Sequence, residues 1–128
     1  MKRGLIHIEA TVSGPRQNSE SLLFLVDSGA TYTVLPEKVW KKIGLKPKRN
    51  MEFTLADGTR IKRKLSECLF RFQNHEAHTP VVLGQHNDQA LLGTITLEIL
   101  GLVLNPLDRT LRPLKAVMMT FNQFRIAG

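Results

Sequence analysis

The sequence contains one cysteine, one tryptophan and one tyrosine among its 128 residues, and it lacks any long apolar run. The lone cysteine, Cys68, excludes an internal disulfide framework and any multi-cysteine zinc or iron–sulfur site built from one chain. No segment approaches the roughly 18 consecutive apolar residues that a membrane-spanning helix needs. The N-terminal MKRGLIHIEA is also unlike a signal peptide, because its apolar stretch is short. We therefore expect a soluble cytoplasmic protein that does not bind a membrane.

The chain does have the length for one domain and a strong positive charge. At 128 residues it can bury one core, so we expect a single domain over residues 1–128. The formal net charge of +7 comes largely from two clusters, Lys41–Arg49 and Arg60–Lys64. Such a surface attracts nucleic acid, anionic lipid or acidic peptides without selecting among them. We interpret the clusters as solvated faces first and as a nucleic-acid site only second.

The first half of the chain predicts a β-hairpin, a short strand and a helix. Leu5–Val12 alternates between apolar and polar residues, as a half-buried strand does. The turn residues of GPRQNSE separate it from SLLFLV, which is apolar on both faces and predicts a central strand. A short TVL strand follows, and Pro36 begins a helical pattern that ends at Gly44.

The next segments predict further hairpins. Met51–Leu55 and Thr59–Leu65 flank the turn Ala56-Asp57-Gly58. Leu69–Phe72 and Thr79–Leu83 predict two more strands around a polar loop, QNHEAH.

The last third predicts a short helix and a final hairpin. ALLGTITLEILGL passes through Gly93 into a helix whose apolar side carries Ile95, Ile99 and Leu102. LVLNPLDRTLRP predicts a hairpin that turns at residues 105–109. The whole pattern is mainly β with one or two short helices.

One stretch, FLVDSGATYTVLP (Phe24–Pro36), places an aspartate at the end of an apolar strand. An unpaired ionised carboxylate is costly to bury, so Asp27 needs a partner. A common structural solution is an Asx turn, in which Asp27 accepts hydrogen bonds from the amides of Gly29 and Ala30. The apolar flanks, the later D-G hairpin and the A-L-L-G-T segment favour a functional role instead.

Taken together, these segments resemble the retropepsin-like aspartic protease family. FLVDSGATYTVL is similar to its catalytic strand and loop, TLADGTRIKRKL to its flap, and ALLGTITLEILGL to the strand, glycine and helix behind the catalytic loop. The resemblance extends from about Leu5 to Pro113. It implies a closed β-barrel of the acid protease fold, with one or two short helices, that forms a two-fold homodimer.

The resemblance also implies aspartic endopeptidase activity without a cofactor or a metal ion. Aspartic proteases activate water between two carboxylates that share one proton, because two like charges about 3 Å apart cannot both ionise. This sequence has a single D-[ST]-G motif, since Asp57, Asp88 and Asp108 lack the motif and its apolar flanks. The second carboxylate would then come from another copy of the chain, with both Asp27 residues on the dimer axis.

The motif assigns roles to the residues of the loop. Asp27 would be the catalytic acid or base, and the Ser28 hydroxyl would hold the two loops together across the axis. Gly29 would let the substrate backbone approach closely, and its carbonyl would accept a hydrogen bond from the substrate. Ala30 would keep the loop narrow where the substrate binds.

The predicted flap and two neighbouring positions depart from the family pattern. Ala56, Asp57 and Gly58 would close over an extended polypeptide substrate, although this tip has neither the glycine-rich sequence of viral enzymes nor the tyrosine of pepsin-like ones. Retroviral proteases usually pair an Asp after the D-[ST]-G-A block with an Arg after the later glycine. This sequence has Thr31 and Thr94 at those positions, which indicates a non-viral branch.

Four other polar residues suggest a metal site only weakly. His75 and His78 have H-x-x-H spacing, with Glu76 and His86 nearby. No cysteine or second well-placed carboxylate completes the ligand set, so we predict a polar loop and no metal.

The single cysteine, the single tryptophan and the apolar C-terminal segment are interpreted as packing residues. Cys68 and Trp40 both lie in apolar patterns typical of a core. Residues 113–128 are rich in apolar side chains and predict a dimerisation tail, with wrapping of the tail around its own domain as the alternative.

Two rival functions stay open at this point. A catalytically inactive retropepsin-fold module could bind nucleic acid or acidic peptides through its basic faces, and a structural domain could use Asp27 only to cap a turn. Retention of Asp27, Ser28 and Gly29 together favours the endopeptidase, because a scaffold has no physical need for a carboxylate at the end of a buried strand.

Overall fold

The computed structural model describes residues 5–105 and 107–113. Strands dominate these residues, and two short helices interrupt them, as the sequence pattern predicts. The elements in chain order are β1 (Ile6–Ser13), β2 (Ser19–Val26), β3 (Thr33–Leu35), α1 (Glu37–Lys42), β4 (Arg49–Thr54), β5 (Arg60–Phe72), β6 (His75–Leu83), β7 (Leu91–Leu92), α2 (Thr94–Leu100), β8 (Leu102–Asn105) and β9 (Thr110–Pro113).

The main sheet closes on itself into a barrel. Its strands follow the order β1-β2-β7-β3-β6-β5-β4, and a further pairing joins β1 to β5. That pairing is antiparallel and joins Thr11–Ser13 to Leu69–Arg71, which completes the ring and leaves β4 outside it. The predicted closed β-barrel is therefore confirmed, and β8 and β9 form a separate two-stranded sheet.

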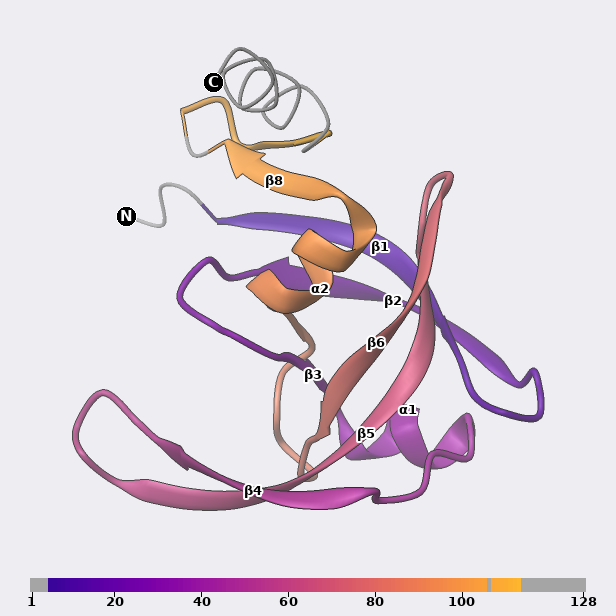
Figure 1. Cartoon of the computed structure of the whole chain (residues 1–128), viewed down its shortest axis with the longest axis vertical. Helices are drawn as coiled ribbons and strands as arrows, with labels where there is room; N and C mark the ends of the chain where they lie inside the picture. The colour runs from indigo at the N-terminus through magenta and orange to yellow at the C-terminus, as the bar shows by residue number, and fades with distance from the viewer. Residues whose placement is uncertain (1–4, 106, 114–128) are drawn as a thin grey trace, which may run out of the picture.

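The β4–β5 hairpin extends away from the barrel as a long arm (Figure 1). Its turn contains the predicted Asp57-Gly58 pair, with Gly58 at a φ of 88°, a left-handed conformation that favours glycine. The prediction of a hairpin at this position is confirmed, because Thr54 pairs with Arg60 next to the turn.

The core is built from apolar residues that every part of the barrel contributes. Phe24 of β2 and Phe70 of β5 are both fully buried, and their ring centroids are 5.1 Å apart. Helix α1 contacts β2, and α2 contacts β3 and β6. Although β2 is an internal strand, as predicted, its Leu23 side chain is 64% exposed.

The prediction of two separate strands before and after Ser66 is wrong, because β5 runs without a break from Arg60 to Phe72. The polar residues that suggested a break are accommodated. The buried Ser66 hydroxyl donates a hydrogen bond to the Lys46 carbonyl oxygen (2.7 Å), and Glu67 is exposed. Pairing with β6 on one edge and with β1 or β4 on the other stabilises the strand.

The predicted apolar side of α2 is also wrong in part. The helix buries Thr96, Leu97 and Leu100, whereas Ile99 is 44% exposed. Thr96 takes a core position because its hydroxyl has hydrogen-bond partners there. Among the described residues, no helix is long and apolar enough to cross a membrane.

Candidate active site

The loop after β2 holds Asp27 with both its backbone and its side chain in hydrogen bonds. The Asp27 amide donates to the Leu92 carbonyl oxygen of β7 (3.1 Å), and the Ala30 amide donates to the Asp27 carbonyl oxygen (3.0 Å). The Gly29 amide donates to Asp27 Oδ1 (2.9 Å), which forms an Asx turn as predicted, but the predicted bond from the Ala30 amide goes to the backbone carbonyl and not to the side chain. Within the described part of the chain, the second carboxylate oxygen, Oδ2, accepts no hydrogen bond. One oxygen of a half-buried carboxylate is thus left for a group outside this loop.

Two glycines near Asp27 differ in what the fold requires of them. A Cβ added to Gly93 would lie 2.5 Å from the backbone carbon of Tyr32, closer than real atoms approach. A Cβ added to Gly29 would meet only Asp27 Oδ1, at 3.3 Å. Gly29 is exposed and its φ is not in the left-handed region, so the described residues do not themselves demand a glycine there.

Residues at the start of α2 fix the far side of the loop through backbone hydrogen bonds. The Thr94 amide donates to the Ala30 carbonyl oxygen (2.9 Å), and the Ile95 amide donates to the Thr31 carbonyl oxygen (3.0 Å). The segments that contain Thr31 and Thr94 are therefore joined by their main chains. Gly93 allows this close approach.

Three buried threonines support the same region, although nothing in the sequence pattern distinguishes them. The Gly93 amide donates to Thr33 Oγ1 (3.0 Å), and Oγ1 of Thr96 lies 2.6 Å from that of Thr33 and 2.8 Å from that of Thr79. The Thr79 hydroxyl also donates to the Pro80 carbonyl oxygen (3.3 Å). Because each hydroxyl donates one hydrogen bond, the chain of donors runs from Thr33 through Thr96 to Thr79.

A cavity of about 380 Å³ lies between the loop and the stem of the hairpin. Gly29 and Ala30 line it, whereas Asp27, Ser28 and the predicted flap-tip residues do not. Tyr32 and Phe53 close one wall, with their ring centroids 5.9 Å apart at an angle of 82°. The other lining residues are Thr31, Val34, Thr54, Leu55, Ile61, Arg63, Val82, Asp88, Gln89 and Leu91.

The predicted flap-tip residues Ala56, Asp57 and Gly58 are exposed in the turn of the hairpin. The Thr59 amide donates to Asp57 Oδ1 (2.9 Å), and hydrogen bonds from the Thr59 side chain and amide lower the pKa of Asp57 below its ordinary value of 3.8. The tip is therefore an ordered turn. The cavity itself is lined by the hairpin stem, which alternation within the strands could have indicated.

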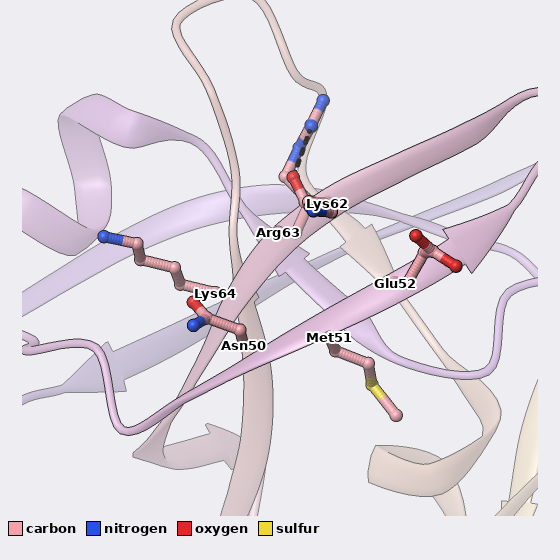
Figure 2. A pocket seen from close by; sticks show the side chains of 6 residues that line it. All are labelled: Asn50, Met51, Glu52, Lys62, Arg63 and Lys64. Carbon is pink, nitrogen blue, oxygen red and sulfur yellow. Dashed lines mark hydrogen bonds between the residues drawn. The ribbon is translucent and has the colours of Figure 1, made fainter.

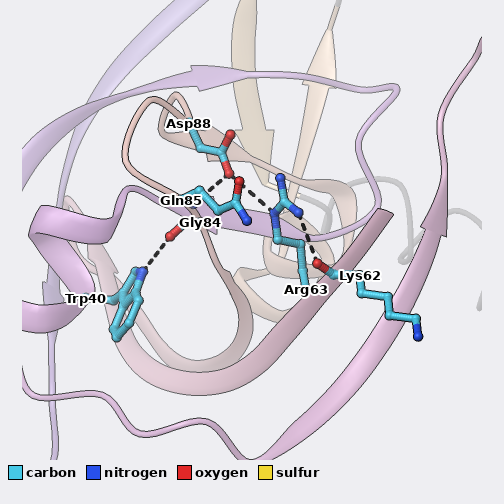
Figure 3. Close-up of polar contacts among 6 residues, drawn as sticks. All are labelled: Trp40, Lys62, Arg63, Gly84, Gln85 and Asp88. Carbon is cyan, nitrogen blue, oxygen red and sulfur yellow. Dashed lines mark hydrogen bonds and ion pairs between the residues drawn. The ribbon is translucent and has the colours of Figure 1, made fainter. Parts of the chain in front are cut away.

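One charged pair connects the hairpin stem to the loop between β6 and β7. Arg63 Nε lies 3.6 Å from Asp88 Oδ2, and the same oxygen accepts a hydrogen bond from the Gln85 amide (2.7 Å). Figure 3 shows this pair beside the hydrogen bond from Trp40 Nε1 to the Gly84 carbonyl oxygen (2.8 Å). Trp40 is half-buried, so its predicted packing role is accompanied by a polar contact.

A second hollow, of about 440 Å³, follows the hairpin itself and lies apart from the Asp27 loop. Figure 2 shows the side chains of the six residues that line it, which come from both strands: Asn50, Met51, Glu52, Lys62, Arg63 and Lys64. Arg63 is a lining residue of both hollows. Its lining contains no residue of the loop, so it is a feature of the basic hairpin surface.

The residues considered for metal binding lie in a strand, not in the predicted polar loop. His75 and His78 are both in β6, three positions apart, and strand alternation turns them to opposite faces. The described residues contain no group of three or more metal-ligating side chains. Cys68 is buried, and burial raises the pKa of its thiol to about 12, so it does not act as a nucleophile.

Residues 15–98 match the model of a family described as "gag-polyprotein putative aspartyl protease". No curated protein sequence matches the chain significantly. Among solved structures, the chain is similar to the solution structure of Simian Foamy Virus (mac) protease, with 22% identity and a TM-score of 0.53. This similarity covers 73% of the present chain and 92% of the viral one.

The matched family segment contains β2, the Asp27 loop, the β4–β5 hairpin and most of α2. It therefore includes both walls of the cavity, and the similarity to the viral protease shows the same fold. The chain belongs to the gag-polyprotein aspartyl protease family, a retropepsin-like family.

Proposed function

We propose that the chain is an aspartic endopeptidase whose active site contains two Asp27 carboxylates, one from each subunit of a homodimer. The observation that carries the proposal is the position of Asp27. It ends an apolar strand, its loop is hydrogen-bonded to β7 and α2, and its Oδ2 accepts no hydrogen bond within the described residues. The single D-S-G motif makes a second copy of the chain the source of the other carboxylate.

The two carboxylates would share one proton, because like charges about 3 Å apart cannot both ionise. The ionised carboxylate accepts a proton from water, and the protonated one polarises the scissile carbonyl group. The pair would titrate as a unit. No metal ion or cofactor takes part in this proposal.

Gly29 supports a close approach by a substrate. The described fold leaves space around its Cα and does not need its conformational freedom, so the requirement for glycine would come from a bound peptide. A peptide running past this residue could offer an amide to its carbonyl oxygen. The Ser28 hydroxyl belongs to an exposed residue and can contact the second subunit.

The cavity supports an extended polypeptide as substrate. Its volume of about 380 Å³ suits a side chain of a bound peptide, and Val34, Ile61 and Leu91 make much of its wall apolar. The peptide would bind as an added strand between the loop and the hairpin. Ala56, Asp57 and Gly58 would then cover its backbone when the hairpin closes and excludes water.

Exposed apolar side chains outside the cavity support self-association. Leu107 is 94% exposed, and Leu5, Ile99 and Val103 are also exposed. Exposed apolar residues, where they gather on one surface, are typical of protein–protein interfaces. The dimerisation tail predicted at residues 113–128 lies outside the described residues except for Pro113.

The first test is cleavage of a pool of unstructured peptides between about pH 4 and pH 7, with new termini identified by mass spectrometry. We expect the wild type to cleave and Asp27→Asn to be inactive. Asp108→Asn is the matched control, because it makes the same chemical change in the β8–β9 turn and should leave cleavage unchanged. Cleavage that continues in Asp27→Asn would contradict the proposal.

A mixing experiment tests the two-subunit site separately. An equal amount of inactive Asp27→Asn protein is added to a fixed amount of wild type under conditions that allow subunits to exchange. If each site needs both Asp27 residues, random pairing places half of the wild-type chains in inactive heterodimers, and activity falls to about half. A monomeric enzyme would keep its full activity.

A further inference from the structure

The cavity beside Gly29 is largely apolar, but two charged side chains reach its wall. Arg63 comes from the stem of the hairpin, and Asp88 comes from the loop between β6 and β7. The Arg63 side chain is only 17% exposed. A cation with so little contact with water needs hydrogen-bond or charged partners, and Arg63 has partners for only some of its N–H groups.

Asp88 is held more firmly than Arg63. Its Oδ2 accepts the Gln85 amide at 2.7 Å, whereas Arg63 Nε lies 3.6 Å away, beyond hydrogen-bond distance. Arg63 Nη1 donates to the Lys62 carbonyl oxygen at 3.0 Å. Among the described residues, Nη2 donates no hydrogen bond. Arg63 therefore lines the cavity with donors to spare, and Figure 3 shows its guanidinium group turned towards Asp88.

We propose that Arg63 is a specificity-determining residue that binds an acidic side chain, Asp or Glu, of the polypeptide substrate. Asp88 is a positioning residue that holds the guanidinium group at the cavity wall. The inference rests on the proposed function, because it assigns a substrate preference to the same cavity. A substrate carboxylate would form charge-assisted hydrogen bonds with the unused donors of Arg63.

The charge of the surrounding chain favours an acidic substrate over a neutral or basic one. Residues 46–64 contain seven lysines and arginines but only two acids, Glu52 and Asp57. Lys62 and Lys64 are exposed on the opposite side of the strand from Arg63. These charges attract acidic peptides to the hairpin, and Arg63 provides the contact inside the cavity.

The test is a peptide library in which one position at a time is fixed as Glu, Gln or Lys. We expect the wild type to cleave the Glu peptides about tenfold faster than the Gln peptides at one position, measured as kcat/KM. Arg63→Met should reduce this ratio to about one, because methionine keeps the apolar stem and removes the donors. Arg63→Glu should reverse the preference towards Lys.

Lys62→Met is the matched control. It removes one positive charge from the adjacent position, but Figure 3 shows the Lys62 side chain pointing away from the Arg63–Asp88 pair. The Glu preference should survive in Lys62→Met. Equal loss in both variants would mean that overall charge sets the preference, and it would overturn a direct contact with Arg63.

Two further variants separate positioning from folding. Asp88→Asn keeps the shape of the positioning residue and should lower the ratio of kcat/KM for the Glu peptides to kcat/KM for the Gln peptides. Arg63→Lys keeps the charge without the planar fork and should retain part of the preference. Thermal unfolding is followed for each variant, so that a folding defect is recognised independently of specificity.

A binding measurement separates this inference from the proposed function. Asp27→Asn protein is titrated with fluorescent Glu and Gln peptides, with and without Arg63→Met, and fluorescence anisotropy gives the dissociation constants. Preference for Glu that depends on Arg63 would support the inference even if the wild type cleaves nothing. Cleavage or binding with no Glu preference would overturn it and leave the protease proposal intact.

Discussion

The Asp27 loop and the β4–β5 hairpin face the same cavity, but the rest of the chain holds them very differently. The loop is joined by backbone hydrogen bonds to β7 and α2, and Gly93 packs directly against its main chain. Within the described residues the hairpin has one free edge, because β4 pairs only with β5. Its stem meets the opposite wall through the Tyr32–Phe53 ring contact and the Arg63–Asp88 pair.

This difference matches two requirements of the proposed protease site. Groups that activate water need a fixed geometry, and a backbone held at several points provides it. In the proposed protease the hairpin would cover the substrate and would have to open and close, which suits the few contacts that hold it to the barrel. Substitutions in the loop should therefore affect stability and catalysis strongly, whereas substitutions in the hairpin should affect substrate binding.

The largest effect is expected from Gly93→Ala. The added Cβ would lie 2.5 Å from the Tyr32 backbone carbon, so either α2 or the loop must move. We expect a loss of more than about 3 kcal/mol in the free energy of unfolding, measured by chemical denaturation. A stable, active Gly93→Ala protein would show that the loop is not held as tightly as its contacts indicate.

Gly29→Ala makes the same chemical change within the Asp27 loop, at a position with space around it. The added Cβ meets only Asp27 Oδ1, so we expect stability to change by less than about 1 kcal/mol. Activity should fall by about a hundredfold, because the methyl group obstructs the substrate backbone. Denaturation and peptide cleavage are measured on the same preparation. Equal loss of stability in the two glycine variants would mean that Gly29 is packed as tightly as Gly93, which would contradict this prediction.

Thr96→Val tests the buried hydroxyl chain behind the loop. Valine would leave the Thr33 hydroxyl without an acceptor and the Thr79 hydroxyl without a donor, in the core. We expect a loss of about 1–3 kcal/mol in unfolding free energy. Thr11→Val, which removes an exposed hydroxyl paired with Ser21, is the control and should cost less than about 0.5 kcal/mol.

Phe53→Ala tests the hairpin wall. Removing the ring opens the cavity and deletes the contact with Tyr32, so kcat/KM should fall about tenfold, mainly through a higher KM. Leu23→Ala removes an exposed apolar side chain away from the cavity and should leave both kinetic constants unchanged. A fall in kcat alone would mean that the ring acts on the loop and not on the substrate.

The smallest effect is expected at the hairpin tip. Hydrogen bonds from Thr59 lower the pKa of Asp57, so the ionised form is favoured in the folded protein. This contribution to stability is present above the ordinary pKa of 3.8 and is lost as the pH falls through the lowered value. An NMR titration of the Asp57 carboxyl should give a midpoint below 3.8, and Thr59→Val should move it upwards. A midpoint that Thr59→Val leaves unchanged would argue against the ordered tip.

The parts of the fold with local signals could be predicted from the sequence. The Leu5–Val12 alternation, the Asp57-Gly58 turn and the apolar strand before Asp27 all depend on neighbours a few positions away, and the structure has these elements. The break placed near Ser66 was wrong because the hydroxyl partner, the Lys46 carbonyl oxygen, lies 20 residues away. The residues next to Ser66 in the sequence do not indicate that partner.

The same limit applies to the site. The D-S-G motif indicated the Asp27 loop because the hydrogen bonds of its turn are made between close neighbours in the sequence. The hydroxyl contact between Thr33 and Thr96 spans 63 positions, and neither threonine differs in its sequence surroundings from an ordinary strand or helix residue. Arg63 belongs to a basic cluster in the sequence and Asp88 lies outside it, and only the folded chain brings the two together.

The unbroken strand β5 has a mechanical consequence. Its first half belongs to the hairpin and its second half is part of the barrel wall, with the change from exposed to buried residues at Leu65. At that point the Lys48 amide donates to the Leu65 carbonyl oxygen (2.8 Å), and Ser66 holds the Lys46 carbonyl oxygen. Because β5 is continuous, a force on the hairpin tip is transmitted along the strand into the barrel wall, and residues 65–66 are the point at which the strand is held.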